Sequence, residues 1–218
     1  MKTAPCPACG APVTFQSASS VFLVCAYCQS TLLRKDLDLE AIGKMAALQY
    51  DATPLQLGTT GKYPAPFTLI GRVRPAWSDG FWNEWFARFD NGREGWLAEA
   101  QGFYMLSFRG PAPVSLPAAG NLRPGLKLNL GKETYLVDDI REVTYSFAEG
   151  ELPFPAPQGF RGISVDLRHG EDGFASILYP ESAAGGLIAS RPPGEFYEGK
   201  YLDFDKLGFA NLRIPDGW

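Results

Sequence analysis

Several features that define common functional classes are missing from this sequence. It contains one histidine in 218 residues, His169, and that residue lies in a polar turn beside Gly170, so no Ser/His/Asp catalytic triad is expected. No run of Lys or Arg forms the basic patch that nucleic acid requires, and the formal net charge is −4. No glycine-rich loop precedes an expected helix, which argues against a phosphate cradle. We therefore expect no nucleic-acid partner.

Long apolar runs and targeting signals are also missing. The longest apolar run is far shorter than the roughly 20 residues of a transmembrane helix. Residues 1–20 hold cysteines and prolines where a secretory signal has a basic start and an apolar core. No cysteine follows residue 28, so none is left to form a disulfide scaffold in the rest of the chain. These absences predict a cytoplasmic protein in a reducing compartment, without direct membrane insertion.

The four cysteines that are present form two C-x-x-C pairs. Cys6 and Cys9 form the first pair, and residues 10–24 separate it from Cys25 and Cys28. Two such pairs at this distance are typical of a structural zinc site, because each pair places two thiolates on one side of a tight turn. The alternatives are buried free thiols or a redox motif, but a redox motif would need a thioredoxin-like βαβ context that is absent here. We predict one structural Zn²⁺ per chain, with four sulfur ligands and no open position for catalysis.

A zinc ribbon is expected over residues 1–34. Residues 13–15 and 21–24 are predicted to pair as a hairpin through a polar, serine-rich turn. The second of these strands would place Cys25 and Cys28 opposite the first cysteine pair. The ribbon therefore depends on the metal as much as on its own short strands.

A connector follows the ribbon at residues 35–50. Its apolar residues recur at helical spacing and predict a short helix, although Gly43 lies in the middle of the pattern. A strand at 45–50 is the alternative. In either case we interpret the apolar stripe as a packing surface.

The rest of the chain has the composition of a mainly β protein. It has 24 glycines, 18 prolines and 13% aromatic residues, a mixture that favours short strands joined by turns. A first β unit is expected over residues 51–110. Its clearest signal is an aromatic hairpin with an Asp-Asn-Gly turn. In its first strand, Trp85, Ala87 and Phe89 would point to one face.

A second β unit is expected after a proline-rich linker or loop at 111–124. It covers residues 125–218 and begins as the first unit does, with a short apolar strand, a glycine turn and a longer strand. This similarity predicts an internal repeat. The expected fold is therefore a zinc ribbon, a short helical connector and two related small β-barrel-like or β-sandwich-like units.

Two groups of side chains outside the cysteines are candidates for a ligand or partner site. The Trp and Phe residues of the first unit either fill a core, which we favour, or form a platform on which a ligand stacks. On a strand, the carboxylates on either side of Gly150 would share one face and could hold a cation or act in acid–base chemistry. We favour a solvated turn there. The candidate residues are Trp82, Glu84, Trp85, Trp96, Glu149 and Glu151.

Motifs spread over most of the chain make it resemble the family catalogued as domain of unknown function 4178. They are Cys-Pro-x-Cys-Gly at 6–10 with the second C-x-x-C at 25–28, Leu-x-Leu-Gly at 55–58, Phe-x-Leu-Ile-Gly at 67–71, Trp-Asn-Glu-Trp at 82–85, Gly-Trp-Leu at 95–97 and Glu-Gly-Glu-Leu-Pro at 149–153. No activity is established for this family. The resemblance implies a cytoplasmic bacterial protein whose gene neighbours include a polyamine-synthase-like enzyme, phage-shock-like membrane-stress proteins and ion channels.

These observations favour binding over catalysis. The cysteine site has no open position, and the carboxylates at 149–153 are the main grouping dense enough for acid–base chemistry. We expect a non-catalytic binding or adaptor protein that contains a zinc ribbon and has a protein partner, in an accessory role to a membrane-stress or polyamine-synthase-like system. The alternative is a small-ligand binder or an enzyme that uses the loop at 149–153.

Overall fold

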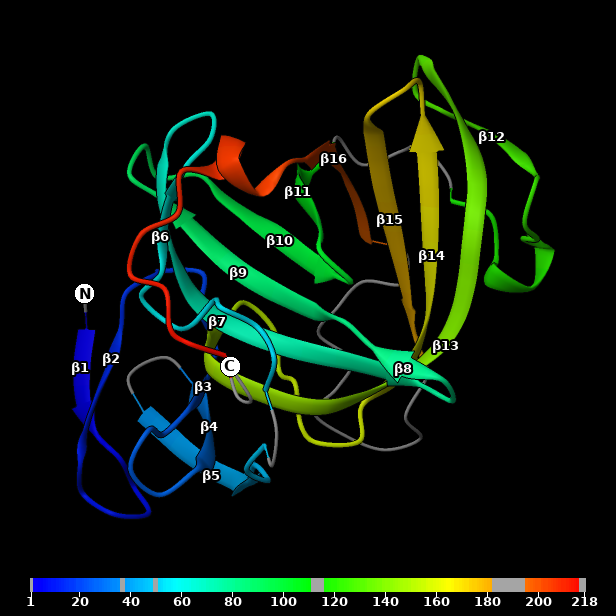
Figure 1. The fold of residues 1–218 in the computed structure, drawn as a ribbon. Helices are drawn as coiled ribbons and strands as arrows, with labels where there is room; N and C mark the ends of the chain where they lie inside the picture. The colour runs from blue at the N-terminus through cyan, green and yellow to red at the C-terminus, as the bar shows by residue number, and fades with distance from the viewer. Residues whose placement is uncertain (1, 36–37, 49–50, 111–115, 182–194, 216–218) are drawn as a thin grey trace.

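Strands make up most of the structure, as the composition predicts. The computed structural model describes residues 2–35, 38–48, 51–110, 116–181 and 195–215 (Figure 1). Within these residues the helices are two short 3-10 turns, η1 (Ala119–Asn121) and η2 (Phe204–Leu207). Neither has the length and apolar character needed to cross a membrane. Glycine and proline supply turns and interrupt helices, which leaves strands as the regular structure. The prediction of a mainly β fold is confirmed.

The N-terminal module consists of two hairpins that each contain one cysteine pair. β1 pairs with β2, and β3 pairs with β4, which also pairs with β5. The prediction that residues 13–15 and 21–24 pair with each other is therefore wrong. Each segment pairs with the strand on the other side of its own C-x-x-C, because that tight turn brings its two flanking strands together. The strands are β1 (Lys2–Pro5), β2 (Pro12–Phe15), β3 (Phe22–Val24), β4 (Ser30–Lys35) and β5 (Asp38–Lys44).

The predicted helical connector is also wrong, because residues 38–44 within it form the strand β5. Thr31 pairs with Gly43 and Leu32 pairs with Ala41, so Ile42 is an extra residue in the ladder. Such a bulge changes the spacing of inward-facing residues from two to three, which resembles helical spacing. The described residues that follow, 45–48, have no regular structure, and the end of the alternative strand lies outside the described residues.

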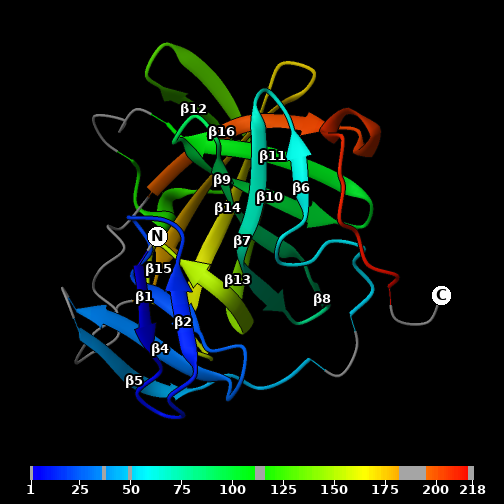
Figure 2. The same cartoon turned by 90° about the vertical axis from the view of Figure 1, so that its left-hand side faces the viewer.

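Eight of the described strands close into an antiparallel barrel (Figures 1 and 2). Their order around the barrel is β7, β9, β10, β11, β16, β15, β14 and β13, and β13 pairs with β7 to close it. The bounds are β7 (Pro66–Trp77), β9 (Asn83–Phe89), β10 (Glu94–Ala100), β11 (Phe103–Arg109), β13 (Glu133–Leu152), β14 (Arg161–His169), β15 (Gly173–Pro180) and β16 (Glu195–Leu202). Because β7 and β13 pair with each other, neither of these strands is left as an open edge of the eight-stranded sheet.

The two expected β units are two halves of this single barrel. In each half a short strand, β6 (Thr60–Lys62) or β12 (Lys127–Leu130), pairs with the long strand that follows it. Three more barrel strands then follow in a meander, and β8 (Gly80–Phe81) extends the hairpin after β7. The halves share one sheet, because β7 pairs with β13 and β11 pairs with β16. Of the expected linker, residues 111–115 lie outside the described residues.

Gly71 of β7 pairs directly with Gly150 of β13, and the two backbones lie close together at this point. A Cβ atom on Gly71 would overlap the carbonyl oxygen of Glu151, and Gly150 has a φ of +67°. Beyond this point β13 leaves β7 and pairs with β3. One strand therefore belongs to the barrel and also holds the N-terminal module at one end of it (Figure 2).

The apolar side chains of β9 pack into different cores on its two faces. Trp85, Ala87 and Phe89 lie together, as predicted, and pack with Leu55 and Leu207 from segments before and after the barrel strands. Phe86 points the other way and packs with Trp96, Tyr145 and Phe154. A third core on the second half of the barrel lies beneath β12. The alternation follows from the two-residue period of a strand.

The contact between β7 and β13 leads to a stability prediction. Gly71→Ala should lower the free energy of unfolding by about 3 kcal/mol, because two backbones must separate to admit one methyl group. Urea unfolding, followed by far-UV circular dichroism, measures this change. Gly120→Ala is the matched control, since a Cβ there would meet nothing within 4 Å. Equal stability of the two variants would contradict the role given to the Gly71 contact.

Candidate functional site

The two C-x-x-C turns have the same backbone geometry. In the first, the N–H of Gly10 donates to the carbonyl oxygen of Cys6 over 2.8 Å. In the second, the N–H of Gln29 donates to the carbonyl oxygen of Cys25 over 2.9 Å. Gly10 and Gln29 occupy equivalent positions and both have positive φ, +77° and +59°. The repeated turn gives each hairpin an equivalent pair of sulfur atoms at its tip.

The four sulfur atoms converge on one point. The Sγ atoms of Cys6 and Cys28 lie 3.8 Å apart, and those of Cys9 and Cys25 lie 3.9 Å apart. All four ligand atoms lie within 4.8 Å of one another. In a tetrahedral site with metal–sulfur bonds of about 2.3 Å, the sulfur atoms are about 3.8 Å apart. The cysteines are free and not joined in disulfides, and their spacing fits one metal ion.

The surroundings of the cluster favour the thiolate form of one ligand, Cys28. Cys6 and Cys25 are buried in a small core with apolar residues of β2, β3 and β4. Hydrogen bonds from the hydroxyl and backbone N–H of Ser30 lower the pKa of Cys28 to about 6. Hydrogen bonds of this kind orient metal ligands. Because the core around the cluster is small, a bound metal would supply much of the module's stability.

Glu151 anchors the N-terminal module to the barrel. Its buried carboxylate accepts hydrogen bonds from the backbone N–H of Gln16, at 2.9 and 3.0 Å, and from that of Ser17, at 3.1 Å. Glu94, at the start of β10, accepts hydrogen bonds from the hydroxyls of Ser17 and Ser19. The segment after β2 is therefore held by two carboxylates that belong to the barrel.

The expectation that Glu149 and Glu151 share one face is wrong. Glu149 lies 3.1 Å from Nη1 of Arg72 and keeps 30% of its side chain exposed, whereas Glu151 is 2% exposed and contacts the N-terminal module. The positive φ of Gly150 breaks the alternation between them. Both residues lie within β13, so the solvated turn is wrong too. Each carboxylate has its own structural partner, and the two do not form an acid–base pair.

A buried ionic network lies beside this strand and was not predicted from the sequence. Arg72 donates to both carboxylate oxygens of Asp51, at 2.7 and 2.8 Å, and Arg74 donates to the same carboxylate at 2.8 Å. Asn83 accepts hydrogen bonds from both arginines, and Arg213 forms a further ion pair with Asp51. Burial opposes the charge on Asp51, but the hydrogen bond and charge of Arg72 outweigh it and lower the pKa. The available sequence signal was two arginines at alternate positions of an apolar strand.

Trp85 and Trp96, two of the candidate ligand residues, are buried. Trp85 is fully buried, donates its indole N–H to Glu99 over 3.1 Å and lies under the guanidinium of Arg72, 4.6 Å from the ring centre. Trp96 is 6% exposed, and its ring packs 5.2 Å from that of Phe86. Trp85 therefore belongs to the packed structure, while Trp96 also borders a cavity.

Trp82 and Glu84 line the same cavity, which lies inside the barrel. It has a volume of about 300 Å³, and each of the eight barrel strands contributes to its wall. Its charged residues include Asp166, whose pKa is raised to about 7 by burial and by the negative charges of Glu84 and Asp139. A cavity of this size, lined by both aromatic and charged side chains, suits a small ligand. The candidate residues therefore have different roles. Trp85 packs in a core and Glu151 holds the N-terminal module, whereas Trp82, Glu84 and Trp96 line the cavity.

Comparisons with family models, curated proteins and solved structures find no match to this chain. A functional proposal must therefore be argued from the geometry of the cysteine cluster, the anchored module and the cavity.

The different surroundings of the two carboxylates on β13 predict different effects of neutralising them. Glu151→Gln should lower the free energy of unfolding by about 2 kcal/mol, because a buried carboxylate that accepts several N–H groups is replaced by an amide that both accepts and donates. Glu149→Gln should cost less than about 1 kcal/mol, since this residue is partly exposed and Arg72 keeps Asp51 as a partner. Guanidinium unfolding of both variants measures the difference. A larger loss for Glu149→Gln would contradict the anchoring role of Glu151.

Proposed function

We propose that this chain is a non-catalytic binding or adaptor protein that contains one structural zinc ion. The observation that carries the proposal is the four-cysteine cluster at the tips of two hairpins that are anchored to the barrel. Four thiolates in a tetrahedron suit zinc and leave no position for water or substrate. Cys6, Cys9, Cys25 and Cys28 would hold the ion, which would supply stability and shape.

The placement of the carboxylates supports binding over catalysis. Glu151 accepts backbone hydrogen bonds, and Glu149 and Asp51 pair with Arg72. Groups that are committed to hydrogen bonds and ion pairs of this kind hold the fold and are poorly placed to exchange protons with a substrate. The described residues near the N-terminal module are therefore better suited to presenting a surface than to a reaction.

β5 offers a surface at which a protein partner could dock. It is the last strand at its end of the sheet, and no other described strand pairs with its outer edge. Unpaired N–H and C=O groups on such an edge can pair with an extended segment of another protein. Tyr27, in the second cysteine turn, is 71% exposed and adds an aromatic ring to the same module. We propose a protein partner that adds a strand to β5.

Three of the motifs behind the resemblance to domain of unknown function 4178 contact one another. Pairing of Gly71 with Gly150 joins the Phe-x-Leu-Ile-Gly motif to the Glu-Gly-Glu-Leu-Pro motif. The N–H of Gly58, which ends the Leu-x-Leu-Gly motif, donates to the carbonyl oxygen of Leu69 over 2.8 Å. We therefore keep membership of that family in the proposal. A bacterial cytoplasm and an accessory role in a membrane-stress or polyamine-synthase-like system complete it.

The zinc part of the proposal is tested by metal analysis. Protein purified without added metal should contain one zinc per chain, and Cys25→Ser should lose it. Chelation should expose the amides of residues 2–35 to hydrogen exchange and leave the barrel strands protected. Ser30→Ala is the matched control, since it should retain zinc but bind it about tenfold more weakly. Stoichiometric iron, or a metal-free module with intact protection, would contradict the proposal.

The adaptor part is tested by proline substitution in β5. Neighbouring N–H groups on a strand point to opposite edges, so one of Glu40→Pro and Ala41→Pro should disturb pairing with β4 and the other should block the outer edge. We expect the variant that keeps its zinc and its melting temperature to lose any partner recovered by affinity purification with the parent chain. Retention of the partner by that variant would rule out docking at β5. Repeated purification that recovers no partner would count against the adaptor function.

A further inference from the structure

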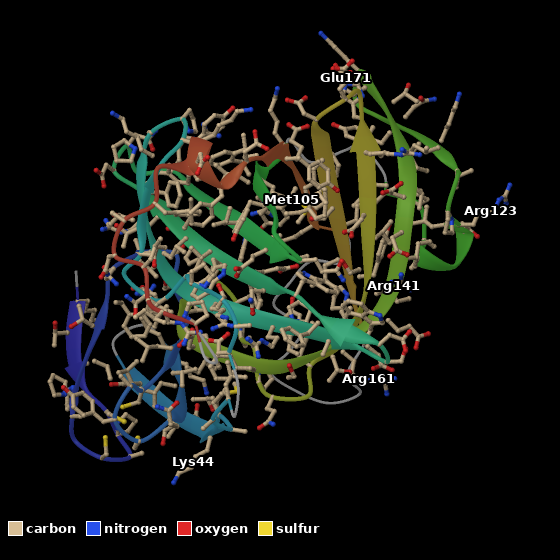
Figure 3. All side chains as sticks on the ribbon, in the orientation of Figure 1. Lys44, Met105, Arg123, Arg141, Arg161 and Glu171 are labelled. Atoms are coloured by element: carbon tan, nitrogen blue, oxygen red, sulfur yellow. The ribbon has the colours of Figure 1, made fainter. Side chains whose placement is uncertain are left out.

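The wall of the barrel cavity carries more negative than positive charge. Among the described residues that line it, the charged ones are Glu84, Asp139, Asp166 and Arg141. Arg141 pairs with Asp139, with 2.8 Å between Nε and Oδ2, so this cation is already matched by one carboxylate. Figure 3 shows Arg141 on β13 and Met105, another lining residue, on β11. The excess negative charge favours a cationic ligand over an anion or a neutral molecule.

Asp166 is a cavity carboxylate without a hydrogen-bond donor among the described residues. The surface that it keeps accessible borders the cavity. Burial, together with the charges of Glu84 and Asp139, raises its pKa to about 7, although the positive charge of Arg141 opposes this shift. Asp166 is half-buried, and a carboxylate in such a position without a hydrogen-bond donor is costly, so a cation or a donor that arrives in the cavity lowers this cost. A cationic donor in the cavity would supply both.

Aromatic rings provide the rest of a site for an organic cation. The rings of Trp77 and Trp82 lie 5.5 Å apart, and Trp82 also donates its indole N–H to Glu84 over 3.0 Å. The guanidinium of Arg141 already lies 5.7 Å from the ring of Trp77, so this wall accommodates a cation beside an indole. Further aromatic rings in the wall are those of Trp96, Tyr145, Phe174 and Tyr197.

A bare metal ion does not fit this arrangement. Among the described residues, the four cysteines are the group of three or more Cys, His, Asp or Glu side chains whose ligand atoms converge enough to hold one ion. Although Asp139 and Asp166 are partners in the ladder of β13 and β14, the three cavity carboxylates do not converge in this way, so a single small ion would not be coordinated by all of them. A cation with several carbon atoms can contact both the carboxylates and the rings.

We propose that the barrel cavity binds a small organic ammonium ion, a protonated amine whose charge is met by Glu84 and Asp166 and whose carbon atoms contact the tryptophan rings. This site is separate from the cysteine cluster and from the edge of β5. It goes beyond the adaptor function, because it assigns a ligand class to the interior of the barrel. Its failure would leave the zinc and docking proposals unaffected.

The experiment compares three probes of similar size and different charge. Butylammonium, butyrate and butanol are titrated into the zinc-loaded, ¹⁵N-labelled full chain at pH 8 and followed by the indole N–H signals in NMR spectra. Butylammonium should shift the Trp82 indole signal with a Kd on the order of 1 mM, the affinity expected of a five-atom fragment. Butyrate and butanol should cause no shift at ten times that concentration, roughly 10 mM, because they cannot pair with a carboxylate as a cation does.

Variants of the cavity carboxylates test whether butylammonium binds in the cavity. Glu84→Gln and Asp166→Asn should each weaken butylammonium binding about tenfold or more. Glu171→Gln removes the same charge from an exposed turn at the far end of β14 and should leave the Kd unchanged (Figure 3). If Asp166→Asn does not fold, Glu84→Gln decides the outcome by itself.

Four results would overturn the proposal. They are the absence of any shift with butylammonium, an equal shift with butyrate or butanol, the same shift with Ca²⁺ or Mg²⁺ alone, and unchanged affinity in Glu84→Gln. The first would show that the cavity takes no small ammonium ion. The second would show that charge does not select the ligand, and the third would indicate an inorganic cation. The fourth would place binding outside the cavity.

Discussion

The direct contact between the backbones of β7 and β13 at Gly71 and Gly150 determines how the rest of the molecule is arranged. Two strands can approach this closely only where neither carries a side chain that the other would meet. The contact closes the barrel, and it also turns the end of β13 toward β3. The N-terminal module is consequently joined to the barrel by strand pairing between β3 and β13, and it is not an independent domain on a flexible linker.

Charged groups near this contact form two separate sets of interactions. Asp51, Arg72 and Arg74 form a buried network whose desolvation cost is offset by several short hydrogen bonds. Glu151 holds the N-terminal module through backbone N–H groups. These residues stabilise the structure because their partners are built in. Asp166 differs from them, since it has a raised pKa and no hydrogen-bond donor in the described structure.

The molecule therefore combines three features that can act separately. The cysteine cluster shapes the N-terminal module, β5 presents an unpaired edge within the described residues, and the barrel encloses a cavity with excess negative charge. The first two support an adaptor function, and the third supports recognition of a small cation. Because the module is anchored through β13, a partner on β5 and a ligand in the barrel would contact the same continuous sheet.

The sequence by itself determined the features that depend on local spacing. Two C-x-x-C pairs predict the sulfur cluster, alternation along β9 predicts its two faces, and a repeated strand pattern predicts two similar halves. Tertiary structure decided everything that depends on which distant segments meet. The two halves pair with each other in one barrel. The spacing around Ile42 that predicted a helix belongs to a strand with a bulge, and Glu149 and Glu151 have different partners. Tertiary structure also brought Asp51 to Arg72 and gathered the cavity wall from eight strands, because pairing between residues far apart in the chain leaves no short-range pattern to detect.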